Sequence, residues 1–452
     1  MQYSFVQDIG LISIFLLVGF IIRYQIKFLQ KLFIPVSIIA GLLALTLANN
    51  GFGLVSFSDQ FSSYAGIMIA FLFGALPFTF EIKKEKSRAF KKATLQMGAG
   101  ATIILLLQWG SGLLLGLTLL SWSFPELNPN FGSILAAGFF GGHGTAAAIS
   151  ESFSLNLQWE EATSLAMTSA TVGIFAATIG GVLFVQWGIR KKHTVFMTSF
   201  DAMPKSLKTG LIPVHEQHSM GKTGFSNIAI DPLLMNFLLV VLVSVTGIFL
   251  TDWSKPLLNG FSIPAFSFAF VVGLLLKQLL KKLRLIDYFD AKVMTRICGF
   301  FADLIVAFGI ASIKIAVVVK YAVPLILLFA FGIILAILFF RAMGPKLFSQ
   351  FWFEKSLFLW GMYLGVTAIG IALLRMIDPE GESETLPTYA LGYIGVTPVE
   401  VACLVFFPIL ASQGYQWYFT LGCLLAAVLL YLITVRFNRK SGIIKHANQS
   451  NP

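Results

Sequence analysis

The chain has little charge and little cysteine. Asp, Glu, Lys and Arg make up only 12% of its 452 residues, whereas 57% of the residues are hydrophobic. This balance excludes a soluble globular protein of this size and predicts an integral membrane protein. The three cysteines (Cys298, Cys403 and Cys423) lie in apolar runs and lack the spacing of metal ligands, so the sequence gives no sign of a disulfide framework or a metal centre.

Two function classes lack support in the sequence. The formal net charge of +11 could suggest a nucleic-acid partner, but Lys and Arg cluster in short loops between apolar runs, where membrane topology explains them better. No paired aspartates, Ser–Lys pair or metal-ligand spacing suggests an enzyme. The N-terminus, "MQYSFVQDIG", has no basic region and no small-residue cleavage site, so we expect the first apolar run to remain as a transmembrane helix.

Apolar runs of membrane length occur throughout the chain. A hydrocarbon core of about 30 Å needs roughly 20 residues of helix. On this template the predicted spans are 6–22, 33–48, 61–80, 93–120 and 160–187, followed by 232–251, 262–276, 297–313, 321–340, 386–411 and 415–436.

The distribution of positive charge predicts the orientation of these spans. With the N-terminus outside, 28 of the 32 Lys and Arg residues fall on the cytoplasmic side, together with the linker 190–231 and the C-terminus. This assignment holds only if the Gly-rich segments 131–149 and 356–374 each enter and leave the membrane from one side. We therefore predict that both segments are re-entrant.

The two halves of the chain resemble each other. "FIPVSIIAGLLALTL" at 33–47 is matched by "SIPAFSFAFVVGLLL" at 262–276, and the five crossings of each half come out in opposite orientation. We predict an all-α polytopic membrane protein with two inverted-topology repeats and one extra C-terminal helix. The expected divisions are the N-terminal repeat 1–189, the cytoplasmic linker 190–231, the inverted repeat 232–411, and an extra helix with a basic tail at 412–452.

The glycines of "GFFGGHGTAAAISESF", at 138–153, predict a break in the helix at membrane depth. Non-helical backbone is tolerated there only where protein or water covers it. Two facing breaks can form a midplane site, in which helix N-termini bind an anion and unwound carbonyls hold a sodium ion. Small residues can also simply allow tight helix packing. His143 could contact substrate, relay protons or bond to neighbouring carbonyls.

Three charged residues lie in or beside apolar segments. The planar guanidinium of Arg375 suits a carboxylate, although an arginine at the membrane edge is also common. Asp303 and Glu400 are candidates for sodium or proton coupling, or are buried structural acids. Hydroxyl oxygens for a sodium site, which could equally be helix-packing groups, are available at Thr168, Ser169 and Thr171.

One motif resembles a known family. "GGHGTAAAISESF", followed by "EEATSLAMTSATVGIFAATIGG", closely resembles the first re-entrant loop and next helix of the bacterial sodium/glutamate symporter family. "GMYLGVTAIGIALLRMIDP" looks like a divergent second re-entrant loop. The order of elements is similar from the first span to residue 411.

This resemblance implies an inner-membrane symporter that takes up L-glutamate or a related anionic amino acid. Na⁺ would be the coupling ion, and the protein would be a homodimer in which a transport domain moves against a scaffold. One side of the substrate site would be Gly141, Gly142, His143, Gly144 and Thr145, and the other Gly365, Thr367 and Gly370, with Arg375 as a further candidate from its chemistry.

Two other readings stay open. The altered second loop allows a sodium-coupled transporter of a dicarboxylate or another organic anion. Two opposed re-entrant loops can also form a passive anion channel.

Overall fold

The computed structural model describes residues 4–32, 34–79, 87–196, 209–217, 219–258, 263–379 and 381–440. All regular secondary structure in these ranges is helical, and nine helices among them are long and apolar enough to cross a membrane. The predicted all-α polytopic membrane fold is confirmed. The centre of the predicted linker (197–208), part of the loop after the third span (80–86) and the tail 441–452 lie outside the described residues.

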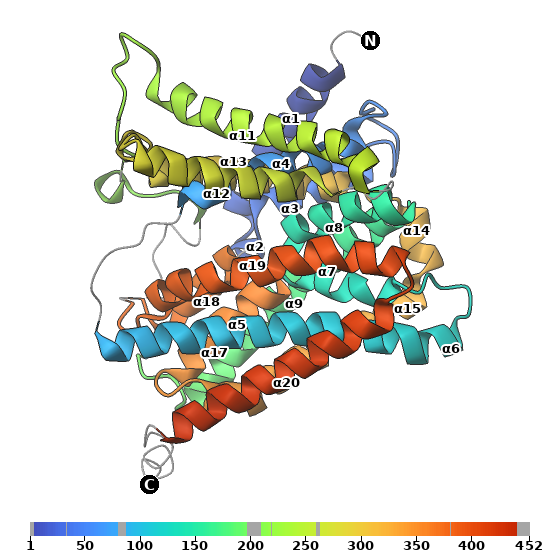
Figure 1. The fold of residues 1–452 in the computed structure, drawn as a ribbon, viewed down its shortest axis with the longest axis vertical. Coiled ribbons are helices and arrows are strands. Elements are labelled where there is room, and N and C mark those ends of the chain that lie inside the picture. Colours follow the sequence, from blue (N-terminus) through green and yellow to red (C-terminus); the bar gives the residue numbers. More distant parts are fainter. Residues whose placement is uncertain are drawn as a thin grey trace.

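The helices form two bundles, which lie one above the other in Figure 1. The first bundle, uppermost in the figure, combines three helices from each half of the chain. Its members are α1 (Ser4–Gln25), α3 (Val36–Leu47), α4 (Tyr64–Thr79), α11 (Pro232–Ser254), α12 (Ala265–Lys282) and α13 (Ala291–Ala311).

The second bundle also draws on both halves. It consists of α5 (Arg88–Leu115), α7 (Ile134–Phe139), α8 (Gly142–Leu157), α9 (Ala162–Arg190), α15 (Ala322–Leu338), α17 (Trp352–Leu364), α18 (Thr367–Ile377), α19 (Thr385–Ser412) and α20 (Gln416–Lys440). The remaining short elements are α2 (Lys27–Lys31), α6 (Ser121–Ser123), α14 (Ile315–Lys320), α16 (Gly344–Leu347), two π-helical turns (Gly116–Leu120 and Phe339–Met343) and 3₁₀ turns at Phe61–Ser63, Phe131–Ser133, Val214–Glu216, Lys255–Leu258 and Ile286–Tyr288.

Close packing of small residues holds each bundle together. A Cβ atom on Gly98 of α5 would lie 3.0 Å from the carbonyl oxygen of Gly392 on α19, so these two backbones touch. In the first bundle, a Cβ on Gly74 of α4 would lie 2.7 Å from Oγ of Ser244 on α11. Such contacts replace the hydrophobic effect, which is weak between helices in lipid.

The two bundles meet mainly at α8. This helix belongs to the second bundle but also packs against α4 and α13 of the first, and α9 touches α13 and α14. The boundary between the bundles therefore runs along α8, beside the predicted glycine break.

Two predicted spans differ in the structure. α3 has 12 residues, which is about 18 Å of helix and too short to cross a 30 Å core by itself. It starts after Pro35 and stops before the turn at Asn49 and Asn50. In the second half, α12 extends beyond the predicted 262–276 and carries Lys277, Lys281 and Lys282 near its end, so only its first part is fully apolar.

Candidate functional site

The first Gly-rich segment is two helices joined by a break. α7 ends at Phe139, Phe140 is extended, and α8 begins at Gly142. Gly141 and Gly142 have φ values of +78° and +65°, a left-handed conformation that disfavours residues with a side chain. A Cβ on Gly141 would also overlap Oγ1 of Thr145. Glycine is therefore required at this break, and the first amides of α8 lack partners within the helix.

The second Gly-rich segment has the same construction. α17 ends at Leu364, Gly365 and Val366 are non-helical, and α18 begins at Thr367. α17 and α18 pack against each other, because a Cβ on Gly361 would lie only 2.7 Å from Cα of Gly370. Gly370 thus serves the packing of this hairpin. Thr367 lies at the break and is exposed.

The two breaks touch each other. A Cβ on Gly142 would lie 2.8 Å from Cγ1 of Val366 and 3.1 Å from the carbonyl oxygen of Gly365. On α9, the Cα of Gly173 faces the carbonyl oxygen of Leu364. The structure therefore brings together unpaired amides from α8 and carbonyl oxygens from the end of α17. Amides of this kind can bind an anion, and carbonyl oxygens can bind a hard cation.

Glu400 of α19 lies directly beside the first break. Its Oε2 accepts a hydrogen bond of 2.5 Å from the hydroxyl of Tyr393, and its Oε1 lies 3.5 Å from Oγ1 of Thr145. A Cβ on Gly141 would be 3.3 Å from the same Oε1. The Glu400 side chain is 7% exposed, and its hydrogen-bond partners are both hydroxyl groups. An ionised carboxylate in this position calls for a cation.

His143 points to α9. Its Nε2 lies 3.1 Å from Oγ1 of Thr171, and this hydroxyl donates its proton to the carbonyl oxygen of Met167. We therefore assign the donor role to Nε2, which leaves Nδ1 as an acceptor. Nδ1 is buried and has no hydrogen-bond partner among the described residues. His143 is therefore a rigid neighbour of the break with one free acceptor.

Other buried polar atoms near the breaks also lack partners in the described part of the chain. They include Oγ of Ser169, which faces Gly138, and the hydroxyl of Tyr363, whose ring stacks on Phe140 with centroids 5.0 Å apart. Gln108 of α5 donates to the carbonyl oxygen of Tyr363 at 3.1 Å, but its own Oε1 is unpaired. Native proteins rarely leave such groups unsatisfied, which fits a place for water, an ion or a substrate.

Four predicted site residues lie apart from the contact between the breaks. Asp303 of α13 accepts a 2.9 Å hydrogen bond from Ser37 of α3, within the first bundle. Thr168 donates to the carbonyl of Ser164 on its own helix. Arg375 is exposed in the last turn of α18, about 12 Å of helix beyond Thr367. Gly144 faces Ile69 of α4.

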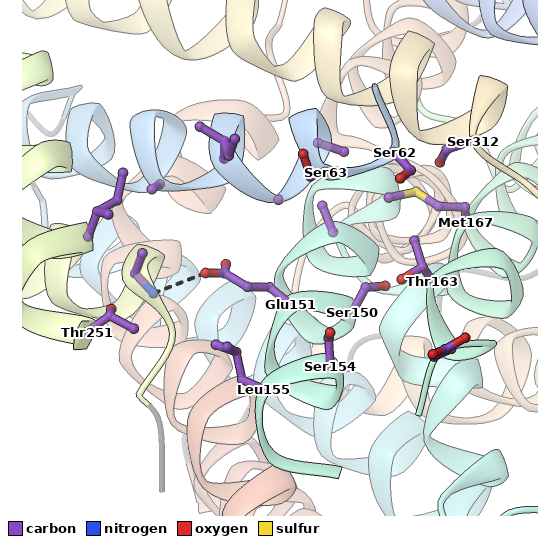
Figure 2. Close-up of a pocket in the computed structure, with 18 of the residues that line it drawn as sticks. Ser62, Ser63, Ser150, Glu151, Ser154, Leu155, Thr163, Met167, Thr251 and Ser312 are labelled. Carbon is purple, nitrogen blue, oxygen red and sulfur yellow. Dashed lines mark hydrogen bonds between the residues drawn. The ribbon is translucent and has the colours of Figure 1, made fainter. Parts of the chain in front are cut away.

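A cavity of about 510 Å³ lies between the bundles, along α8. Figure 2 shows Ser150, Glu151 and Ser154 of α8 on one wall, with Ser63 and Thr251 of the first bundle opposite. Oε1 of Glu151 accepts a hydrogen bond of 3.3 Å from the amide of Ala265, drawn as a dashed line in Figure 2. The face of α8 that carries Ser150, Glu151 and Ser154 thus borders this cavity.

Sequence reasoning missed two of these residues. Tyr393 precedes Glu400 by seven residues, which places both side chains on one face of α19, so the helical spacing was an available signal. Glu151 is a carboxylate in an otherwise uncharged segment, the same signal that singled out Glu400.

Comparison with known proteins gives one match. The family model described as sodium/glutamate symporter matches residues 1–350, which includes the first break and ends just before α17. None of the curated proteins compared and none of the solved structures compared matches the chain. The match covers more than half of the sequence and agrees with the predicted resemblance. The chain belongs to the sodium/glutamate symporter family, which supports sodium-coupled glutamate transport as its general activity.

Proposed function

We propose that this protein takes up L-glutamate, or a closely related anionic amino acid, together with Na⁺. The observation that carries the proposal is the contact between the two breaks, where Gly142 lies against Val366 and Gly365. Because both breaks expose unpaired backbone groups at one place, a substrate and an ion can bind side by side.

The anionic groups of the substrate would bind the first amides of α8 and α18. These helices start at Gly142 and Thr367, and helix N-termini favour negative charge. Hydroxyl groups of Thr145 and Thr367 would add hydrogen bonds, and His143 would hold one wall of the site. Arg375 stays a predicted carboxylate ligand that would need another position of α18 relative to the substrate.

Sodium would bind beside the first break, next to Glu400 of α19. Glu400 would supply a negative charge, and Ser169, Thr171 and the carbonyl oxygens at the end of α17 would supply the hard oxygen ligands that Na⁺ needs. Thr168 and Asp303 were predicted as further ligands; their hydrogen bonds to Ser164 and Ser37 favour structural roles.

Transport would proceed by an elevator movement. Each bundle contains helices from both halves of the chain, which supports the predicted inverted repeats, and both breaks lie in the second bundle. The second bundle, with the two hairpins that we predict to be re-entrant, would carry the site past the first bundle, and the cavity along α8 would be one access path. The first bundle would then form the homodimer.

The protein would lie in the inner membrane with its N-terminus outside. The basic loops, the linker 190–231 and the C-terminus would then be cytoplasmic, as the distribution of Lys and Arg favours. The cavity between α4, α8 and α11 would open to the outside, because its lining residues lie at the ends of these helices distant from the linker.

The test is uptake of radiolabelled L-glutamate into proteoliposomes, with and without an inward Na⁺ gradient. We expect concentrative uptake that requires the gradient and is inhibited by excess unlabelled glutamate. Uptake that neither saturates nor needs Na⁺ would instead support a passive anion channel.

A second substrate class has a specific observation in its favour. The family match ends at residue 350, and the second break at 365–366 lies beyond it. This half of the pocket would contact the substrate side chain, so a dicarboxylate or another organic anion could replace glutamate. Competition by malate, citrate and aspartate in the same assay distinguishes these substrates from glutamate.

A further inference from the structure

An apolar groove of about 550 Å³ lies on the second bundle, away from the two breaks. α9 and α15 form its walls, and Trp360 of α17 closes its base. Ile179 and Leu183 are 46% and 60% exposed along it. The groove therefore offers a long hydrophobic surface at the depth of the membrane core.

The base of the groove is rigid. The rings of Phe184 and Phe340 stack with centroids 4.1 Å apart, and Trp360 meets Phe184 edge-on at 4.8 Å. The indole nitrogen of Trp360 also donates a 3.0 Å hydrogen bond to the carbonyl of Ala177. Because these groups are fixed by packing, a ligand would bind a preformed surface with little cost of ordering.

The end of the groove nearest the linker is basic. The guanidinium of Arg341 lines the groove and lies 5.0 Å from the ring of Trp187. The ring centroid of His193 lies 4.8 Å from that of Trp187. The amide of Lys191 donates a 2.9 Å hydrogen bond to the carbonyl of Trp187, so Lys191 lies one helical turn beyond the groove. Burial lowers the pKa of His193, and the charges of Lys191 and Arg341 lower it further. None of the ion pairs within the described ranges involves Lys191 or Arg341.

The helix changes shape where this basic end begins. The last turn after α15, Phe339–Met343, is π-helical, a form that occurs often at functional sites. Arg341 is exposed within this turn. An aromatic ring and basic groups at the end of an apolar groove match the chemistry of a phospholipid at the membrane interface.

We propose that this groove binds one anionic phospholipid. Its acyl chains would lie along α9 between Ile179 and Trp187, and its phosphate would bind Arg341 and Lys191. An anionic headgroup is favoured over a zwitterionic one, because the groove ends in positive charge that forms no ion pair among the described residues. The site does not depend on the transported substrate.

The position of the groove gives the lipid a mechanical role. Phe175 and Ile179 also line a second apolar cavity of about 520 Å³, on the side of α9 that faces α1 and α3. A lipid held on α9 would thus move with the second bundle and lie next to its boundary with the first. We expect the bound lipid to stabilise the second bundle.

The experiment titrates purified protein in a neutral detergent with dioleoyl-phosphatidylglycerol or dioleoyl-phosphatidylcholine. Bound lipid is counted by native mass spectrometry, and the thermal unfolding midpoint is measured in parallel. We expect one phosphatidylglycerol to be retained and to raise the midpoint more than phosphatidylcholine. Arg341→Gln should weaken the binding of phosphatidylglycerol about fivefold, and Arg341→Gln with Lys191→Gln about 25-fold, since each basic group near an anionic headgroup contributes about that factor.

Two further variants give the controls. Arg436→Gln removes an exposed charge of α20 outside the groove and should leave the affinity unchanged. Ile179→Trp fills the groove without altering its charge and should weaken binding of both lipids. Equal retention of the two lipids, or unchanged binding in the Arg341→Gln variant, overturns the proposal. Disulfide formation between two copies at Ile179→Cys would also overturn it, because the groove would then be a protomer interface.

Discussion

Replacing Gly142 by alanine tests whether the two breaks touch. The new Cβ would lie 2.8 Å from Cγ1 of Val366, well inside normal van der Waals distance, and the residue would keep a φ of +65°. The left-handed conformation costs about 1–2 kcal/mol, and overpacking adds about 1–3 kcal/mol. We expect Gly142→Ala to lower the free energy of unfolding by about 2–5 kcal/mol and to slow Na⁺-driven uptake by at least tenfold.

A second substitution separates these two costs. Val366→Ala removes the atom that the new Cβ would meet, so the double variant should recover the overpacking cost, about 1–3 kcal/mol, but not the backbone cost. The matched control is Gly144→Ala, two residues further along α8. A Cβ there meets only Cδ1 of Ile69 at 3.7 Å, an ordinary contact, so this variant should be as stable as the original or slightly more stable.

The measurements are the thermal unfolding midpoint of the purified variants and their initial uptake rates in proteoliposomes. Together the single and double variants measure the interaction energy between positions 142 and 366. If Val366→Ala gives no rescue beyond the sum of the single effects, the two breaks do not touch, and the proposed site has to be abandoned.

Glu400→Gln should raise the Na⁺ concentration for half-maximal uptake by at least tenfold, because the carboxylate of Glu400 is the only acidic group at the proposed ion site among the described residues. The control Glu126→Gln, at an exposed position, should leave this concentration unchanged. An unchanged Na⁺ dependence of the Glu400→Gln variant would remove Glu400 from the ion site. A cysteine at the exposed Ser123 should react with a membrane-impermeant thiol reagent added outside intact cells, and labelling only after permeabilisation would reverse the orientation. His193 should titrate below its ordinary pKa of 6.5, because burial and the nearby cations disfavour its protonated form. The segment around His193 therefore loses stability as the pH falls below about 6.5 toward the lowered pKa. Arg341→Gln should shift the titration midpoint of His193 upward in NMR of histidine-labelled protein, and a downward shift would contradict this arrangement of charges.

The hairpin at the second break illustrates what a local pattern can predict. Glycines at 361, 365 and 370 indicated an interrupted helix, and α17 and α18 are separated at Gly365 and Val366. The sequence pattern could not show which glycine forms the turn and which allows the helices to pack, because both kinds of glycine look the same in a local sequence. Only the contact between Gly361 and Gly370 assigns these two to packing.

The acidic residues show the same limit. Asp303 and Glu400 were both predicted as ion ligands, because a carboxylate in an apolar run is costly wherever it lies. In the structure, Asp303 bonds to Ser37 of α3, whereas Glu400 lies beside Gly141 and Tyr393. The sequence shows that a carboxylate lies in an apolar helix, but the residue that forms its hydrogen bond can lie on another helix and is known only from the structure.

The sequence by itself determined that this is a polytopic membrane protein, the approximate positions of most of its spans, and that the Gly-rich segments 131–149 and 356–374 are interrupted. These features depend on hydropathy and on backbone preferences, which act over one or two turns of helix. Only the tertiary structure decided that the six helices of the first bundle separate from the second bundle and that Gly142 meets Val366. A membrane helix is apolar on most of its surface, so the periodicity of its sequence does not indicate which face packs against another helix. The packing face depends on the close fit of small residues between helices.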